Sequence, residues 1–517
     1  MIQTIKIRVI SVNIMETEIE IKFFFNAHFA DELLHKISQY TVISHKNQML
    51  YNVYFETPTR ALRAMDMGLR VRRIDGQSTQ TIKTSGRVIG GLHQRPEYNE
   101  PIEGLDPQLA LFNNKIWPDD CDIKQLQTQL SPLFSTDFRR LHWLLEMPDG
   151  TLIEVAYDCG KITAAQQEED ICEIELELVK GDEAQLFVLG KDIASLPQVR
   201  LGNVSKAQRG YMLNEGANFA VKPIDFSDLQ PEMDLKEALS VNFQHGLKHL
   251  QYHENCYLEG GDFNALVELQ KSIMFLHQNI HLFHDAGTSF KGYSWVEDLQ
   301  WLARSFSWVD ERLVFQKLLE NKAYYIRKLP KLKQLQKNLR LAEQALPSEE
   351  DIFNMLHSSR YCHFVLGLTE WLIKLEKTAQ KEHDSNSLLA FSDKALTEGW
   401  SKLKAELSAE PLLTIENLLQ HQGLLAANLM IGFSVGNLFD AKRSVEYCYP
   451  WLDIYQGMQE LSMLDAIYEQ ALEEEDIEIR NEYFKWVKRK QYSLLSAIEQ
   501  SKQYAVANEM YWLEPEH

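Results

Sequence analysis

Several segments of the N-terminal half alternate charged with apolar residues, and the charged positions could bind phosphate or metal ions. In residues 16–22, ETEIEIK, the side chains of Glu18, Glu20 and Lys22 fall on even positions, so a β-strand would place them on one face. A surface strand whose polar face meets water would explain one such segment. The recurrence of the pattern in further segments instead favours a charged interior.

Other charged residues also share one face of a predicted strand: Arg70 with Arg72, Arg95 with Glu97, Glu154 with Asp158, and Glu173 with Glu175 and Glu177. Neighbouring carboxylates repel one another, so acid-rich strands need cations or a metal beside them. A closed barrel of about eight strands points every second residue inward and can hold a small ligand. Its interior would offer carboxylates to hard divalent cations and Arg or Lys to phosphate oxygens.

The elements that must position these residues follow from the hydrophobic pattern. From Met15 to about residue 215, period-two alternation bounded by Gly, Pro, Asp and Asn predicts a mainly antiparallel β domain. Asp149-Gly150 is expected at the tip of a hairpin, and helical patterns interrupt the strands at residues 26–40 and 182–196. The first half of the chain is therefore predicted to be β with a few helices.

The second half has a different period. Beyond about residue 220, apolar residues recur three and four positions apart for about 290 residues, with few Gly or Pro. The fold class is therefore predicted as α+β, with an antiparallel eight-stranded barrel over 15–216 and an all-α domain over 232–517. Residues 217–231 carry two prolines and are the predicted linker.

Composition excludes several classes of protein. The chain has 517 residues and a formal charge of −21, which disfavours binding to nucleic acid phosphates. Six cysteines without a CxxC pair are typical of a reducing cytoplasm, and no apolar run of about 18 residues predicts a membrane helix. Residues 1–14 lack the pattern of a signal peptide. They are interpreted as an upstream extension from a mis-set start codon, with an extra strand as the alternative.

Eight short motifs then occur in a recognisable order: ExExK at residues 18–22, LRVRR, TIKTSG, GGLHQRPEY, DFRRLHW, EVAYDCG, CEIELEL and VSKAQRGY. This series, spread over about 190 residues, resembles the CYTH superfamily, which groups thiamine triphosphatases, class IV adenylate cyclases and inorganic triphosphatases. The resemblance implies an antiparallel tunnel that binds triphosphate with Mg²⁺ or Mn²⁺.

Roles for individual residues are implied by the same resemblance. The expected metal ligands are the carboxylates Glu18, Glu20, Glu97, Asp158, Glu173, Glu175 and Glu177. The expected substrate-binding cations are Lys22, Arg70, Arg72, Lys83, Arg140 and Lys206. The expected catalytic residues are Lys22, Lys83, Glu175 and Glu177, with water activated by Glu175 or Glu177 or by a metal that they hold. A ligand role and a structural role stay equally open for Arg73, Arg95, Arg139 and Arg209, whereas Cys159 and Cys172 are interpreted as core filler.

The expected reaction is hydrolysis of inorganic triphosphate to pyrophosphate and phosphate, because no base-stacking motif accompanies the charged strands and GGLHQR and SKAQRGY resemble the bacterial inorganic triphosphatases. The alternatives are a triphosphate or polyphosphate-binding module without catalysis, an adenylate cyclase and a thiamine triphosphatase. Neither a nucleic acid nor a membrane is an expected partner, and the sequence leaves the oligomeric state open.

The helical half resembles a CHAD domain, a module associated with polyphosphate. It departs from that family in charge, because residues 221–517 hold 30 Lys and Arg against 44 Asp and Glu, which puts polyphosphate binding in doubt. His245, His249 and His253 fall four apart and would stack on one helical face, as a zinc site or, more simply, as structural residues. His277, His281 and His284 leave the same choice, and the basic run from Arg327 to Arg340 is interpreted as a solvated helix face that could also receive a polyanion.

Overall fold

The computed structural model describes residues 16–216, 219–285, 287–319, 326, 328–377, 385–409 and 414–513. The proposed extension at residues 1–14 lies outside this part of the chain. The described residues form two compact units. One contains residues 16–216 together with 356–370, and the other contains the remaining helical segments.

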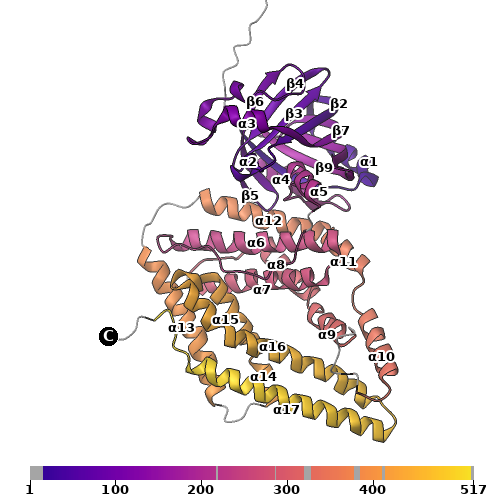
Figure 1. The fold of residues 1–517 in the computed structure, drawn as a ribbon, viewed down its shortest axis with the longest axis vertical. Helices are drawn as coiled ribbons and strands as arrows, with labels where there is room; N and C mark the ends of the chain where they lie inside the picture. The colour runs from indigo at the N-terminus through magenta and orange to yellow at the C-terminus, as the bar shows by residue number, and fades with distance from the viewer. Residues whose placement is uncertain are drawn as a thin grey trace, which may run out of the picture. The chain divides into compact units, whose positions relative to one another are not determined.

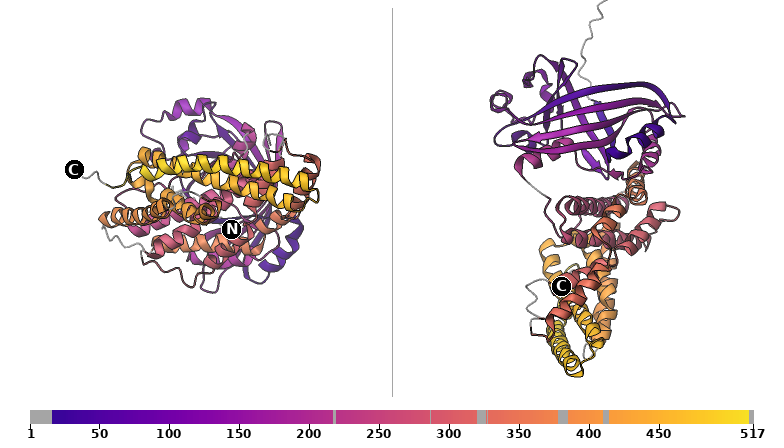
Figure 2. Two further views of the ribbon diagram at one scale, coloured as in Figure 1. Left: turned by 90° about the horizontal axis from the view of Figure 1, so that it is seen from below. Right: turned by 90° about the vertical axis from the view of Figure 1, so that its right-hand side faces the viewer.

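The first unit is built on a closed antiparallel barrel (Figure 1; Figure 2). Its eight strands follow one another around the barrel in the order β1, β9, β8, β7, β2, β3, β4, β6, and pairing of β1 with β6 closes the ring. Their bounds are Glu16–Phe24 (β1), Thr41–Glu56 (β2), Gly68–Ile74 (β3), Gln77–Lys83 (β4), Leu92–Ile102 (β6), Ser131–Glu146 (β7), Leu152–Ala164 (β8) and Gln167–Lys180 (β9). Short strands β5 (Arg87–Ile89) and β10 (Arg200–Leu201) pair with β6 and β1. The predicted eight-stranded barrel is confirmed.

Alternation along the strands separates a charged interior from an apolar exterior. On β2 and β3 the odd-numbered residues Val53, Phe55, Leu69 and Val71 belong to a buried core cluster that also contains Leu62 of helix α2. Helices α2 (Ala61–Ala64) and α3 (Ile123–Gln129) contribute to this cluster, so they cover the outer face of these strands. The even-numbered residues are left to line the interior.

Local signals set the boundaries of several elements. The hairpin between β7 and β8 turns at Gly150, whose φ of 83° lies in the left-handed region that favours glycine, as predicted. The N-terminal half of β6 pairs with β1 and its C-terminal half with β4. Strand β6 contains Pro96 and Pro101, which lack a backbone N–H and make a strand hard to predict.

The remaining helices of this unit are α1 (Ala30–Ile37), α4 (Ala184–Ala194) and α5 (Lys206–Glu215). Helix α5 begins at the N-cap Ser205, whose side chain accepts a hydrogen bond from the backbone N–H of Gln208. Its Tyr211 packs in a cluster with Phe134, Tyr54 and other buried residues of the barrel. This packing fixes the first residue of α5, Lys206, against the barrel strands.

The second unit is helical, as predicted (Figure 1). The helices that follow the barrel in sequence are α6 (Leu235–Gly260), α7 (Phe263–Asp285), α8 (Ser294–Ser305), α9 (Val309–Leu319), α10 (Leu332–Gln344), α11 (Glu349–Leu356), α12 (Ser359–Lys377), α13 (Ser385–Ala409), α14 (Ile415–Gln420), α15 (Gln422–Val435), α16 (Ala441–Leu472) and α17 (Ile477–Ala507). A capping box at Asp234 and Glu237 begins α6, and residues 219–230 before it form no helix or strand. Within the described part of the chain, no helix is long and apolar enough to span a membrane.

Candidate active site

The barrel encloses a cavity of about 490 Å³ that is lined mainly by charged side chains. Most of the residues predicted from the sequence line it: Glu18, Glu20, Lys22, Arg70, Arg72, Lys83, Glu97, Arg140, Glu175, Glu177 and Lys206. Asp158 and Glu173 do not belong to the lining, because both side chains are completely buried behind it. The barrel therefore brings together residues that are up to 188 positions apart, from Glu18 to Lys206.

Asp158 and Glu173 support the basic wall of the cavity from behind. Asp158 accepts two hydrogen bonds from the guanidinium of Arg140, each of 2.7 Å, and its Oδ2 lies 2.6 Å from Nζ of Lys206. Glu173 accepts a hydrogen bond of 3.0 Å from Lys22 and also contacts Lys206. Both carboxylates thus neutralise cations that reach into the cavity.

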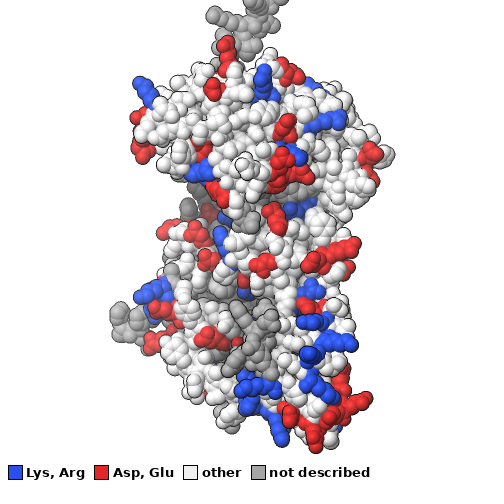
Figure 3. Space-filling model, turned by 45° about the vertical axis from the view of Figure 1, so that its right-hand side comes forward, with Lys and Arg blue, Asp and Glu red and all other residues white. Residues whose placement is uncertain are grey.

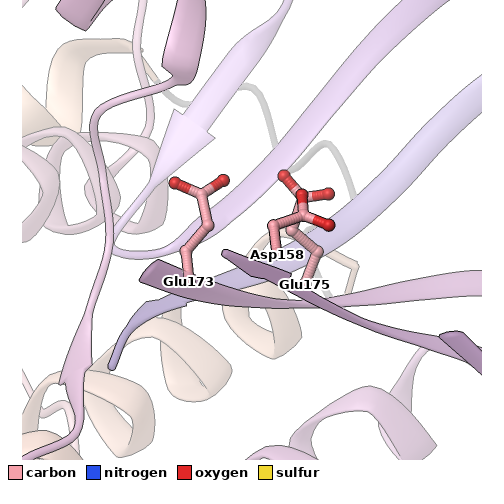
Figure 4. A group of neighbouring side chains, drawn as sticks. All are labelled: Asp158, Glu173 and Glu175. Carbon is pink, nitrogen blue, oxygen red and sulfur yellow. The ribbon is translucent and has the colours of Figure 1, made fainter. Parts of the chain in front are cut away.

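Among the described residues, one carboxylate cluster could bind a metal by distance alone. Oxygen atoms of Asp158, Glu173 and Glu175 lie within 4.8 Å of one another, and Figure 4 shows the three side chains rising from one face of β8 and β9. All three carboxylates already contact Lys206. A divalent ion at this position would have to displace the ammonium group of Lys206, so we regard the cluster as an anchor for cations.

Glu175 is surrounded by positive charge. It pairs with Lys22, with Lys206 at 3.0 Å and with Arg140 at 2.6 Å. Burial opposes ionisation of this carboxyl, yet the three cations hold its pKa well below the usual range. For Lys22, the charges of Glu173, Glu175 and Glu20 outweigh burial and raise the pKa of the ammonium group well above its usual range. Glu175 is therefore a weak base and a firm ion-pair partner.

The opposite situation exists in a row of carboxylates across β1, β9 and β8. Glu20 lies directly opposite Glu177, and Glu177 lies directly opposite Glu154. Burial, followed by the charges of Glu18, Glu154 and Glu20, raises the pKa of Glu177 to about 8. This part of the cavity carries more negative charge than its cations compensate, and carboxylate oxygens are the ligands that hard divalent cations prefer.

Lys83 lies at the edge of this acidic region. It forms ion pairs with Glu18 and, at 3.0 Å, with Glu97. Burial lowers the pKa of Lys83, but these two carboxylates outweigh it and the pKa is raised. Glu97 also lies 3.6 Å from the guanidinium of Arg70, so it connects Lys83 with the basic wall.

Arg70, Arg72 and Arg140 form the arginine part of the basic wall. The Nε atom of Arg70 is buried and lacks a hydrogen-bond partner, so it could serve an anionic ligand. Burial and the neighbouring Arg70 and Arg140 lower the pKa of Arg72 to about 10. Three guanidinium groups that repel one another are stabilised when a polyanion lies between them.

The structure separates the four arginines whose roles the sequence left open. Arg95 lines the cavity and its guanidinium lies 3.3 Å from Asp66. Arg209 lies 3.3 Å from Glu173 and supports the buried network. Arg73 is exposed, and Arg139 points away from the cavity on an exposed face, where it donates a hydrogen bond to Asn47.

Several lining residues were not predicted as site residues: Asn52, Tyr54, His93, Asn99 and Glu154. The sequence pattern did indicate Glu154, because it shares a strand face with Asp158. His93 directly faces Glu20 across β1 and β6, and its Nε2 lies 3.2 Å from the carbonyl oxygen of Gly202. Nothing in the spacing of Asn52 distinguishes it from an ordinary polar residue.

Cys159 and Cys172 lie opposite one another on β8 and β9, on the face that points away from the charged interior. Their Sγ atoms are 3.8 Å apart, and Sγ of Cys159 donates a hydrogen bond of 2.9 Å to the hydroxyl of Tyr157. Both cysteines are half-buried and free. They take no part in the cavity.

His249 and His253 of the helical unit are hydrogen-bonded to protein groups, whereas Nε2 of His245 is buried without a hydrogen-bond partner. Nδ1 of His249 lies 2.6 Å from Oγ of Ser272, and Nε2 of His253 accepts a hydrogen bond of 3.2 Å from the backbone N–H of Lys222. Neither these residues nor His277 and its neighbours form a metal-ligand cluster within the described residues. These contacts support the structural interpretation over the zinc site.

The basic run of the helical unit has acidic neighbours. Arg327 lies outside the described residues, whereas Lys333, Lys337 and Arg340 are exposed on α10, whose Leu335 and Leu339 are buried. Lys331 lies 2.8 Å from Glu474. On the face of this unit drawn in Figure 3, Lys and Arg side chains gather in a column flanked by Asp and Glu. The arrangement is that of an amphipathic helix with a solvated face.

A closed antiparallel barrel with a charged interior defines the class of the N-terminal unit. Residues 16–211 match the family model of the CYTH domain. Residues 242–426 match the family model of the CHAD domain. The chain therefore contains a CYTH domain followed by a CHAD domain, and both predicted resemblances are confirmed.

Individual proteins are similar to parts of the chain. An inorganic triphosphatase of Haemophilus influenzae is 40% identical over 203 residues, which are 39% of this chain and 56% of that protein. The chain thus spans about half the length of this curated relative.

Two solved structures also resemble parts of the chain. A candidate adenylyl cyclase from Hippeastrum, described as having a dominant triphosphatase activity, is 18% identical, with a TM-score of 0.29 over 39% of this chain and 96% of its own. The CHAD domain of the plant Ricinus communis is 16% identical, with a TM-score of 0.44 over 55% of this chain and 96% of its own. Both TM-scores lie below 0.5, so neither similarity supports an assignment.

Proposed function

We propose that the protein hydrolyses inorganic triphosphate to pyrophosphate and phosphate with the help of a divalent metal ion, Mg²⁺ or Mn²⁺. The observation that carries this proposal is the division of one enclosed cavity into a basic wall and an uncompensated acidic row. The basic wall suits the oxygens of a polyanion, and the acidic row suits a hard cation beside it. The similarity of the barrel to the inorganic triphosphatase of H. influenzae supports the same reaction.

The proposed substrate contacts come from six cations: Lys22, Arg70, Arg72, Lys83, Arg140 and Lys206. Phosphoryl transfer depends mainly on positioning and on neutralising charge, and these residues supply both. Lys22 and Lys83 are also proposed as catalytic residues, because each reaches the border between the basic wall and the carboxylates. Their ammonium groups can stabilise the negative charge of the transferred phosphoryl group.

The proposed metal ligands are the carboxylates that face the cavity: Glu18, Glu20, Glu97 and Glu177, with Glu154 added from the structure. The fit is chemical, since Glu20, Glu177 and Glu154 are neighbours across three adjacent strands and the pKa of Glu177 is raised to about 8. A divalent ion bound there would polarise the phosphoryl group. For Asp158, Glu173 and Glu175 we propose a different role from direct metal binding, namely holding Lys22, Lys206 and Arg140 in place.

For water activation we favour Glu177 over Glu175. Glu175 pairs with Lys22, Lys206 and Arg140, which hold its pKa well below the usual range and make it a poor base. No cation forms an ion pair with Glu177 within the described residues. Glu177, or a metal ion that it would hold, would assist removal of the proton from water as the water oxygen attacks the terminal phosphorus. The bond between that phosphorus and the bridging oxygen then breaks, and pyrophosphate leaves.

Finally, we propose domain boundaries at 15–216 and 232–517, joined by residues 217–231; the two family models match 16–211 and 242–426, which lie within these boundaries. We propose no substrate for the helical domain, because its acidic composition argues against binding of a polyanion. We propose a cytoplasmic location from the cysteine pattern of the sequence.

The test is phosphate release from tripolyphosphate, ATP and thiamine triphosphate, each with Mg²⁺, Mn²⁺ or EDTA. We expect rapid, metal-dependent release from tripolyphosphate and slower release from the two organic triphosphates. Formation of cyclic AMP from ATP would identify a cyclase instead. Absence of turnover with all three substrates would leave the barrel as a binding module and refute the proposed reaction.

A further inference from the structure

One cation of the cavity differs from all the others in its partner. Within the described residues, Lys22, Arg70, Lys83, Arg95, Arg140 and Lys206 each form an ion pair with a carboxylate, as described above. Arg72 forms none within 4.0 Å. Its Nε donates a hydrogen bond of 2.8 Å to Oδ1 of Asn52, which is a neutral amide.

Asn52 is itself held from the other side. It lies on β2 directly opposite Arg72 on β3 and Thr136 on β7. Its Nδ2 donates a hydrogen bond of 2.8 Å to Oγ1 of Thr136. Asn52 is 1% exposed and Thr136 is 0% exposed, so neither side chain can exchange these bonds for water. The two hydrogen bonds, from Arg72 to Asn52 and from Asn52 to Thr136, therefore fix one nitrogen of the guanidinium across three adjacent strands.

We propose that Asn52 is a positioning residue that holds Arg72 at the cavity surface without neutralising its charge. Asn52 accepts a hydrogen bond only from Nε of Arg72. Both terminal nitrogens of the positively charged guanidinium are therefore left for the ligand. The inference rests on the proposed triphosphate site and deepens it. Arg72 is the cavity cation without an ion-pair partner within 4.0 Å among the described residues, so its contribution is greatest for a ligand of high negative charge, such as tripolyphosphate.

The same strands provide a matched pair outside the cavity. Nε of Arg139 on β7 donates a hydrogen bond of 2.9 Å to Oδ1 of Asn47 on β2. That pair is exposed and does not line the cavity. Replacing each asparagine with aspartate makes the same chemical change in the two places, and only one of them faces the proposed ligand.

The decisive variant is therefore Asn52→Asp, with Asn47→Asp as its control. Aspartate has nearly the shape of asparagine, can accept a hydrogen bond from the hydroxyl of Thr136, and adds a carboxylate that pairs with Arg72. We expect about a tenfold or greater rise in KM for tripolyphosphate and a matching loss of affinity for a non-hydrolysable imidotriphosphate measured by calorimetry. The melting temperature should stay equal or rise, because a buried cation gains a partner. Asn47→Asp should leave all three quantities unchanged.

Thr136 provides a second test that does not alter charge. Thr136→Val removes the acceptor for Asn52 and should weaken imidotriphosphate binding several-fold, whereas Thr136→Ser keeps the hydroxyl and should restore most of it. For Asn52→Asp, a role of Asn52 in folding alone would lower stability and binding together, whereas the proposed role lowers binding without lowering stability.

Binding and turnover distinguish the two levels of the hypothesis. If the wild-type protein binds imidotriphosphate through Asn52 but hydrolyses no triphosphate, the positioning role stands and the proposed reaction fails. If Asn52→Asp binds imidotriphosphate as tightly as the wild type, the positioning role is overturned while the reaction is untouched. Failure of the wild type to bind any triphosphate overturns both.

Discussion

Replacing Glu177 with glutamine should show separately how much the acidic row lowers folding stability and how much it contributes to metal binding. In the wild type, burial and three neighbouring carboxylates raise the pKa of Glu177 from an ordinary 4.5 to about 8. The folded, metal-free protein therefore prefers the protonated carboxyl. The contribution of Glu177 to the free energy of unfolding is fully present below about pH 4.5 and is lost as the pH rises through 8. Glutamine removes this dependence because it carries no charge at any pH.

The magnitude follows from the same two values. A difference between about 8 and 4.5 corresponds to at most roughly 5 kcal/mol against ionisation, and partial access to solvent reduces this to roughly 2–4 kcal/mol. At pH 9 and without metal, Glu177→Gln should therefore be more stable than the wild type by this amount. A domain of this size melts about 2–4 °C higher for each kcal/mol. At pH 5 the two proteins should differ little.

Metal binding should show the opposite preference. A divalent ion needs the ionised carboxylate, and at pH 7 about nine-tenths of Glu177 is protonated in the metal-free protein. Binding at pH 7 should thus release about one proton and be about tenfold weaker than at pH 9. Calorimetry in buffers of different ionisation enthalpy measures the proton directly. Glu177→Gln should bind Mn²⁺ more weakly, without proton release from this site.

The control is Glu168→Gln on the same strand. Glu168 is exposed at the far end of β9, where it pairs with Lys161. This variant should behave as the wild type in every measurement. Equal Mn²⁺ affinity of the wild type at pH 7 and pH 9, or a Glu177→Gln protein that is less stable than the wild type at pH 9, would refute the reasoning.

Three further predictions address other parts of the barrel. Lys83→Ala should lower turnover of tripolyphosphate by about 100-fold or more while circular dichroism stays unchanged, and a folded variant of normal activity would contradict its assigned role. Gly210→Ala should lower the free energy of unfolding by about 1–3 kcal/mol, because the added methyl group would overlap the ring of Phe134, and denaturant titration would detect this. Hydrogen bonding with Cys172 and Tyr157 lowers the pKa of Cys159 to about 6, so Cys159 should react with iodoacetamide at pH 7 faster than Cys172, whose pKa is raised. Peptide mass spectrometry after short labelling measures the order, and equal rates would exclude it.

Much of the barrel was predictable from local pattern. The parity of Glu18, Glu20 and Lys22 predicts one charged face, and the structure places all three in the cavity. Period-two alternation is set by the backbone of a single strand, so it requires no knowledge of the strand's neighbours. Strand β6 was harder to predict, because Pro96 and Pro101 interrupt the pattern that identifies other strands.

The partners of each charge could not be predicted in the same way. Glu175 and Glu177 are two residues apart on one strand and look equivalent in the sequence, yet the pKa of one lies well below the usual range and that of the other is about 8. The difference arises because Glu175 faces Lys22 and Lys206, whereas Glu177 faces Glu20 and Glu154.

The sequence by itself determined the β and helical halves and which residues share the interior of the barrel, because these depend on residue type and periodicity along one segment. The two domain families followed from the resemblance of its motifs to known families. Only the tertiary structure decided which carboxylates anchor cations, which remain uncompensated and that Asn52 holds Arg72. Those properties depend on the register between strands that are distant in the sequence, and a shift of one residue would reverse every inward and outward position.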